Sequence, residues 1–273
     1  LRNVPVGYSF LNHMLTAVMG NNYKVHKLLE NIILQLITFH SYEDLKIVIF
    51  TNNKNKDSWS FVKYLPHNFD NSRTFRFFSA NSDDAKEISN YLEQELFYRR
   101  FDENMNETGR DYTLCRPYYL IITDNYSSIR RLDIMKDITE IENNYGFSLV
   151  MLENLMSRLP SRCNNFITVG EKKSGILEDA YENQRSINFV DEVSYDLNMD
   201  LVCKRLSNIP IEFEYGAKEM PNTITFLEME SVGKVEGLNI INRWKNNDPT
   251  KSLRTEVGVD ENGDTLYLDL HEK

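Results

Sequence analysis

The feature that most constrains the fold is a repeated alternation of short apolar runs with amphipathic helical stretches. The apolar runs Leu15–Gly20 and Leu45–Thr51 enclose a stretch in which apolar residues recur at i, i+3, i+4 and i+7 from Val25 to Ile37. A strand, a helix and a strand of these lengths predict a βαβ unit with parallel strands. The run "LKIVIFT" is rich in β-branched residues, which favours a strand covered on both faces.

The same alternation continues to about residue 210. Further strands are predicted at Thr74–Ala80, Tyr118–Asn125, Phe147–Glu153 and Asn165–Gly170, with an edge strand at Asn183–Val190. Helices are predicted at Trp59–Leu65, at Ser82–Leu96 with Ser82 as the N-cap, at Ser128–Asn143 and at Asp200–Asn208. We therefore predict a three-layer α/β fold with a mostly parallel sheet and helices on both faces.

The pattern changes near Met220, which predicts two domains, 1–219 and 220–273. The second part contains a predicted helix at Val235–Asn246, a break at Asp248-Pro249 and a β-hairpin. Asn262-Gly263 is a strong two-residue hairpin signal. Trp244, Leu238 and Ile241 fall on one stripe of the predicted helix, which makes this stripe a candidate contact face between modules. An equally good reading is that Trp244 packs on its own domain.

Composition excludes several classes of function. The net charge of −10 and the pI near 5.1 argue against a nucleic-acid surface, which needs clustered Lys and Arg. The three cysteines are far apart, so we expect an intracellular protein with neither a disulfide framework nor a zinc site. The five histidines show no metal-ligand spacing, and we predict no metal and no cofactor.

A candidate phosphate-binding loop follows the first strand, in "GNNYKVHK" from Gly20. A working P-loop reads G-x-x-x-x-G-K-[ST]. Counted from Gly20, the second glycine falls on Val25, the lysine on His26 and the Ser/Thr on Lys27. Val25 brings a branched side chain to an open turn, His26 is shorter than lysine and mostly neutral, and Lys27 offers no hydroxyl to magnesium. A hydrolytic site is therefore not expected.

A candidate Walker B strand, "LIIT", leads into Asp124 and Asn125. The aspartate of such a site is present, but the carboxylate that polarises the attacking water is replaced by an amide that accepts no proton. Gly20 and Asp124 both follow predicted strands, at the edge where open α/β sheets place their ligands. We predict a degenerate nucleotide pocket at this edge.

Segments along nearly the whole chain resemble the EssC/EccC family of type VII secretion ATPases, which are FtsK/SpoIIIE-like motors. "NIINRWKNNDPTKSL" and "VGVDENGDTLYLDLHEK" are similar to the lead into the first hydrolytic module of that family. "VPVGYSFL", "GNNYKVHKLLENIILQLITFHSYEDLKIVIF" and "YLPH" resemble the membrane-proximal ATPase-like module that precedes it. Since the family places a Walker A loop soon after the sequence matching "LDLHEK", we expect this chain to be a fragment.

The resemblance implies a RecA/Rossmann-like module with degenerate nucleotide motifs on the cytoplasmic side of the cell membrane. The family exports small helical WXG-type substrates. Partners would be the following ATPase modules of the same chain, neighbouring secretion subunits and, indirectly, WXG-type substrates, but no nucleic acid. The favoured hypothesis is a non-hydrolytic coupling or scaffold module. The alternatives are a regulatory domain that binds ATP or ADP without turnover and an unrelated α/β enzyme.

Overall fold

The alternation folds into one eight-stranded sheet with the strand order β3-β2-β4-β5-β1-β6-β7-β8. This computed structural model describes residues 4–101, 115–171, 173–190, 196–209, 225–229, 235–259 and 265–270. The strands from β3 to β6 in this order are parallel, and β7 and β8 continue the sheet antiparallel. The strands are β1 Leu15–Gly20, β2 Leu45–Phe50, β3 Phe78–Ser79, β4 Tyr118–Thr123, β5 Phe147–Leu152, β6 Asn165–Val169, β7 Ser174–Glu178 and β8 Arg185–Phe189.

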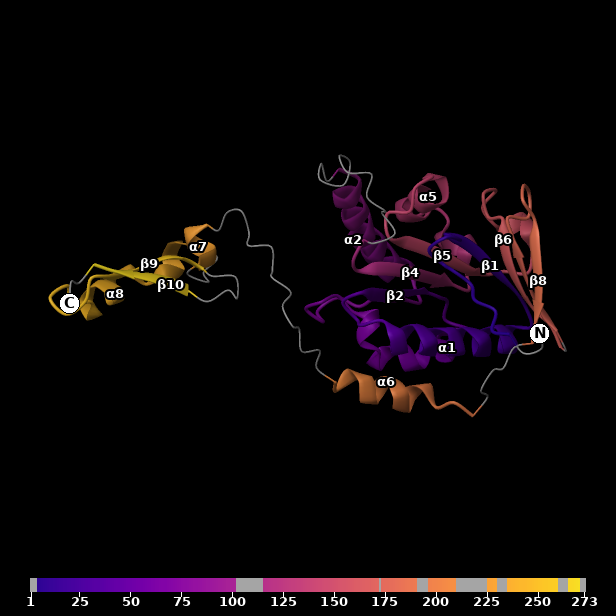
Figure 1. Ribbon diagram of the computed structural model, residues 1–273, viewed down its shortest axis with the longest axis horizontal. Helices are drawn as coiled ribbons and strands as arrows, with labels where there is room; N and C mark the ends of the chain where they lie inside the picture. Colours follow the sequence, from indigo (N-terminus) through magenta and orange to yellow (C-terminus); the bar gives the residue numbers. More distant parts are fainter. Residues whose placement is uncertain are drawn as a thin grey trace. The chain divides into compact units, whose positions relative to one another are not determined.

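Helices cover both faces of this sheet, as Figure 1 shows. On one face α2 (Ser82–Phe101), α4 (Tyr126–Ile129) and α5 (Asp133–Glu140) enclose a buried core with the strands. On the other face lie α1 (Asn22–Phe39), the 3₁₀ helix η1 (Lys56–Tyr64) and α6 (Met199–Ser207). Shorter 3₁₀ turns are η2 (Pro66–Asn68) and η4 (Met156–Arg158). The prediction of a three-layer α/β fold is confirmed.

The parallel strands bring several chain segments to one edge of the sheet. β1 lies between β5 and β6, with Ala17 opposite both Met151 and Phe166. β4 lies between β2 and β5. Because these strands run in the same direction, the residues that follow them meet at what we call the carboxyl edge. Gly20, at the end of β1, and Asp124 and Asn125, directly after β4, lie at this edge.

Three predicted elements of the first unit differ from the structure. The strand predicted at Thr74–Ala80 is limited to β3, because Phe77 N–H donates to Asn68 O and Asp70 N–H to Phe75 O, which turns the earlier residues back on the chain. The helix predicted at Ser128–Asn143 is split into α4 and α5. Asn81, and not Ser82, caps α2, since its Oδ1 accepts the backbone N–H groups of Asp83 and Asp84.

The chain divides into two units, Leu1–Pro210 and Ile211–Lys273, while the boundary predicted at 219/220 lies outside the described residues. The second unit contains α7 (Phe226–Met229), η5 (Val235–Leu238) and α8 (Ile240–Asn246). Its strands β9 (Arg254–Val259) and β10 (Thr265–Asp269) pair antiparallel, as the hairpin prediction requires. The turn residues Asn262 and Gly263 are outside the described residues.

Candidate functional site

The junction between β1 and α1 is one residue long. Gly20 ends β1, and α1 begins at Asn22. Gly20 has a φ of +148°, and a Cβ there would lie 2.5 Å from the carbonyl oxygen of Val169, so only glycine fits without strain. Asn21 caps the helix, and its Oδ1 accepts the backbone N–H of Tyr23 at 3.0 Å. No loop therefore remains to wrap around a phosphate.

The side chain of Asn154, just after β5, pairs with both backbone groups of Gly20. The Gly20 N–H donates to Asn154 Oδ1 at 2.8 Å, and Asn154 Nδ2 donates to the Gly20 carbonyl at 3.1 Å. A phosphate site at a helix N-terminus relies on free backbone N–H groups. Here the N–H groups of Gly20 and Tyr23 already have side-chain partners within the chain.

His26 and Asp124 face each other at the carboxyl edge. His26 Nε2 lies 3.6 Å from Asp124 Oδ2, and the two side chains are 12% and 3% exposed. Asp124 Oδ2 also accepts the Thr51 hydroxyl at 2.9 Å and the Trp59 indole N–H at 3.1 Å. The His26 and Trp59 rings are 5.2 Å apart between centroids. We call these four residues the carboxyl-edge cluster.

The hydrogen bonds of His26 define its charge. Its Nδ1 lies 2.8 Å from the Asn22 carbonyl, which only accepts, so Nδ1 carries a proton. Nε2 then faces the Asp124 carboxylate favourably only when it is protonated too. Burial lowers the pKa of His26, but the Asp124 carboxylate and the Asn22 carbonyl outweigh burial, and the net pKa is raised. The raised pKa favours the protonated imidazole, which is the form that suits the neighbouring Asp124 carboxylate.

The other predicted pocket residues are not in this cluster. Val25 is 2% exposed and packs in the core beneath α1. Lys27 Nζ lies 2.7 Å from Glu30 Oε2 on the same helix. Asn125 donates its backbone N–H to Thr123 Oγ1 and precedes α4. Thr51, Trp59 and Asn154 were missed, because each of these residue types is common and only the fold brings them to the same edge.

These residues do not fit a magnesium–nucleotide group. His26, at the P-loop lysine position, faces Asp124 at 3.6 Å, and Asp124 Oδ2 already accepts hydrogen bonds from Thr51 and Trp59. Among the described residues, no group of three or more His, Cys, Asp or Glu side chains could hold a metal ion. Chemically, the arrangement places a histidine whose pKa is raised next to a largely buried carboxylate of the same chain.

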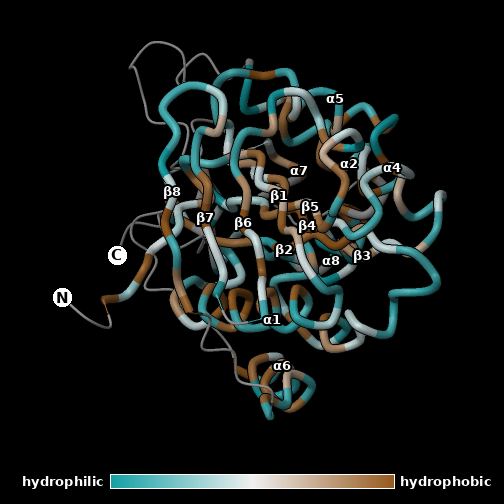
Figure 2. The backbone as a smooth tube through the Cα atoms, turned by 90° about the vertical axis from the view of Figure 1, so that its right-hand side faces the viewer, coloured by the Kyte–Doolittle hydropathy of each residue, from teal (hydrophilic) through white to brown (hydrophobic). Residues whose placement is uncertain are grey.

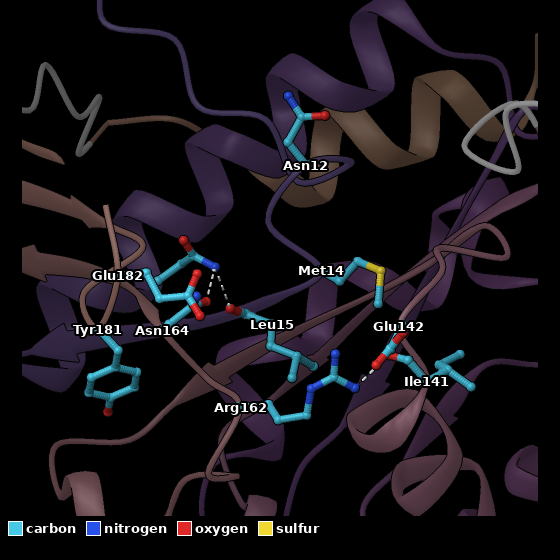
Figure 3. A pocket seen from close by; sticks show the side chains of 10 residues that line it. Asn12, Met14, Leu15, Ile141, Glu142, Arg162, Asn164, Tyr181 and Glu182 are labelled. Carbon is cyan, nitrogen blue, oxygen red and sulfur yellow. Dashed lines mark hydrogen bonds between the residues drawn. The ribbon is translucent and has the colours of Figure 1, made fainter. Parts of the chain in front are cut away.

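Two hollows in the described surface are not lined by any of the four cluster residues. One of about 390 Å³, shown in Figure 3, lies at the opposite edge of the sheet, beside the start of β1 and β6. Its lining includes Glu142, Glu182 and Arg162, whose guanidinium donates to the carbonyls of Glu140 and Ile141. A second hollow, of about 380 Å³, borders Lys27, Glu30 and Asp57.

The predicted contact stripe of the second unit is interrupted. Asn239, with φ 49° and ψ 43°, adopts the left-handed conformation and separates η5 from α8, so the single helix predicted at Val235–Asn246 is wrong. Leu238 is 7% exposed, whereas Ile241 and Trp244 are 67% and 76% exposed. Leu238 therefore belongs to the interior, and only Ile241 and Trp244, three residues apart on α8, share a surface face.

Comparison with known proteins identifies relatives along almost the whole chain. The type VII secretion system protein EssC of Staphylococcus aureus (strain NCTC 8325 / PS 47) is 27% identical over 263 residues, which is 96% of this chain. The ESX secretion system protein EccC of Geobacillus thermodenitrificans is 22% identical over the full chain. The chain is homologous to the EssC/EccC type VII secretion ATPases. It spans 18% of the length of each of these relatives. No protein-family model matches the chain.

Solved structures of EssC share the fold. EssC (ATPases 2 and 3) from Geobacillus thermodenitrificans aligns with 96% of this chain and 55% of its own, at a TM-score of 0.54 and 10% identity. The cytoplasmic domain of EssC aligns with 96% of this chain and 56% of its own, at a TM-score of 0.50 and 12% identity. The mostly parallel α/β architecture of this chain is thus also found in the EssC ATPase structures.

Within the described part of the chain, no helix has both the length and the apolar character needed to cross a membrane.

Proposed function

We propose that this chain is a non-hydrolytic coupling module of a type VII secretion motor. The observation that carries the proposal is the pairing of His26 with Asp124, because it places the chain's own cation where a P-loop would present lysine to phosphate. The one-residue junction at Asn21 and the Asn154 side chain on Gly20 support the same conclusion. The module is a P-loop-like fold whose nucleotide position is closed by side chains.

The coupling role follows from what contacts the cluster. Trp59 donates to Asp124 from η1, and it shares a core with Met199 and Cys203 of α6. α6 is the last described helix before the segment that leads to the second unit. Through Trp59, the carboxyl-edge cluster is thereby connected to α6, the helix after which the chain continues toward the following modules.

The second unit supplies the proposed contact face. Ile241 and Trp244 are exposed on α8, and the two-stranded sheet of the same unit exposes Leu266 and Leu268. A hairpin alone is marginally stable, so apolar surface of this kind favours packing against a neighbouring module. The partners we propose are the following ATPase modules, neighbouring secretion subunits and, indirectly, WXG-type substrates, at the cytoplasmic side of the cell membrane.

Two experiments test the proposal. The purified chain should show no magnesium-dependent ATP turnover; turnover that Asp124→Ala abolishes would contradict the non-hydrolytic role. In the full-length secretion protein, Ile241→Ser combined with Trp244→Ser should reduce substrate export at unchanged protein level. Val235→Ser, at a residue 58% exposed in the same unit, is the matched control. Normal export by the double variant would contradict the coupling face.

A further inference from the structure

The hollow in Figure 3 combines an apolar lining with two carboxylates. Its volume of about 390 Å³ is in the range of ligand sites. Leu15 begins β1, one of the hydrophobic strands in the middle of the sheet in Figure 2, and with Met14 and Ile141 it supplies the apolar lining. In Figure 3 the side chains of Glu142 and Glu182 lie on either side of Leu15.

The amide donors of the lining are engaged within the chain. Asn164 Nδ2 donates to Asp179 Oδ1 at 3.0 Å. Asn165, which is 6% exposed, donates its Nδ2 to the Leu15 carbonyl and to Asn164 Oδ1. These two side chains therefore shape the hollow and leave their N–H groups unavailable to an anion.

The remaining charges of the lining are predominantly negative. The carboxylates of Glu142 and Glu182 are exposed, and neither has an ion-pair partner among the described residues. The hollow also adjoins the C-terminal end of α5, whose C-cap is Ile141, and this end of a helix carries partial negative charge. Among the described residues that line the hollow, Arg162 is the only cation, and its Nη1 is held by the carbonyls of Glu140 and Ile141.

We infer that this hollow binds an arginine side chain of a partner protein. A guanidinium has five N–H donors and no acceptor, so it complements two carboxylates that lack partners. Its methylene groups suit Met14, Leu15 and Ile141, because long basic side chains bury their stems against apolar surface. Tyr181, which is 67% exposed and lines the same hollow, presents a ring on which a guanidinium stacks better than an ammonium.

Arg162 gives the inference a second test, of opposite sign. Its guanidinium occupies two main-chain carbonyls at the end of α5 and adds a positive charge to the lining. An incoming arginine is repelled by this charge, so removing it should strengthen binding, whereas removing Glu142 and Glu182 should weaken it. The inference is independent of the proposed function, because none of the carboxyl-edge cluster residues lines this hollow.

The experiment titrates N-acetyl-arginine amide into the ¹⁵N-labelled 273-residue chain and follows the backbone amide shifts by NMR. N-acetyl-norleucine amide, which has a stem without charge, and N-acetyl-glutamate amide, which has the opposite charge, are the control probes. The arginine probe should shift the amides of the residues that line the hollow, in a saturable way that weakens with added salt. The two control probes should give no saturable shift there.

Three variants test the residues. Glu142→Gln with Glu182→Gln should weaken binding of the arginine probe about fivefold, as the loss of two exposed ion pairs predicts. Asp83→Asn with Glu87→Gln makes the same change in net charge at exposed positions of α2 and should leave the affinity unchanged. Arg162→Gln should bind the probe more tightly than wild type. Thermal unfolding checks that each variant is folded.

Several outcomes would overturn the inference. They are the absence of saturable shifts with the arginine probe, equal binding of the norleucine probe and tighter binding of the glutamate probe. Unchanged affinity after the loss of Glu142 and Glu182, or weaker binding by a folded Arg162→Gln chain, would refute the assigned charges. Tighter binding of N-acetyl-lysine amide than of the arginine probe would refute the choice of arginine.

Discussion

The imidazole of His26 and the carboxylate of Asp124 lie 3.6 Å apart in a buried cluster that also holds Thr51 and Trp59. In a working P-loop the equivalent positions bind phosphate and magnesium. Here the two side chains face each other, and we propose that this pairing takes the place of a bound nucleotide.

Removing the cation of this pair should destabilise the chain. His26→Gln leaves the Asp124 carboxylate buried with only its Thr51 and Trp59 donors, so the free energy of unfolding should fall by about 1–3 kcal/mol. Lys24→Gln is the matched control, because Lys24 pairs with a Glu171 side chain that is 84% exposed, and it should cost less than ~1 kcal/mol. Urea unfolding measures both. Equal losses in the two variants would refute the buried pair.

The His26 contribution should depend on pH in a definite direction. Burial lowers the pKa of His26, but Asp124 and the Asn22 carbonyl raise it further than burial lowers it. The unfolded pKa of histidine is about 6.5, and the folded pKa of His26 lies above it. The stabilisation by protonated His26 is therefore complete below the unfolded pKa and is lost as pH rises through the folded pKa. The difference in unfolding free energy between wild type and His26→Gln should therefore shrink from pH 6 to pH 9. A constant difference would speak against a protonated His26.

The backbone of Gly20 should not tolerate a side chain. Gly20→Ala places a Cβ 2.5 Å from the Val169 carbonyl oxygen at a φ of +148°, and we expect a loss of about 1–3 kcal/mol. Gly7→Ala is the control, since a Cβ there meets nothing within 4 Å. The melting temperatures of the two variants measure this difference. A Gly20→Ala protein as stable as Gly7→Ala would contradict the close approach of Gly20 to Val169 at the junction of β1 and α1.

Lys46 on β2 has a buried amino group whose described polar contact is the face of the Tyr42 ring, 5.9 Å from its centroid. It is 1% exposed, its Nζ has no hydrogen-bond partner in the described structure, and burial lowers its pKa to about 8. Lys46→Met keeps the length of the side chain and removes the cost of burying the charge, so it should stabilise the chain by about 1–3 kcal/mol at pH 7. Lys86→Met, at an exposed position of α2, should change stability little. Destabilisation by Lys46→Met would show that the charge is needed.

The period of the apolar residues was enough to predict the main strands and α1, because buried strands and amphipathic helices repeat at fixed intervals. It also placed Gly20 and Asp124 at the same edge, since both follow parallel strands. It did not reveal β7, whose five residues are short, or the interruption at Asn239, which depends on one left-handed residue. The partners Thr51, Trp59 and Asn154 come from three segments far apart in the sequence, and only the strand order brings them together.

The most direct test of the central claim is a calorimetric titration of magnesium-ATP, to millimolar concentration, into the wild-type chain and into His26→Lys. The variant restores the P-loop lysine but leaves the one-residue junction and the Asn154 contact with Gly20 unchanged. If side chains close the nucleotide position, both titrations give only the heat of dilution. Saturable binding to the wild-type chain that is lost in Asp124→Ala would contradict the account.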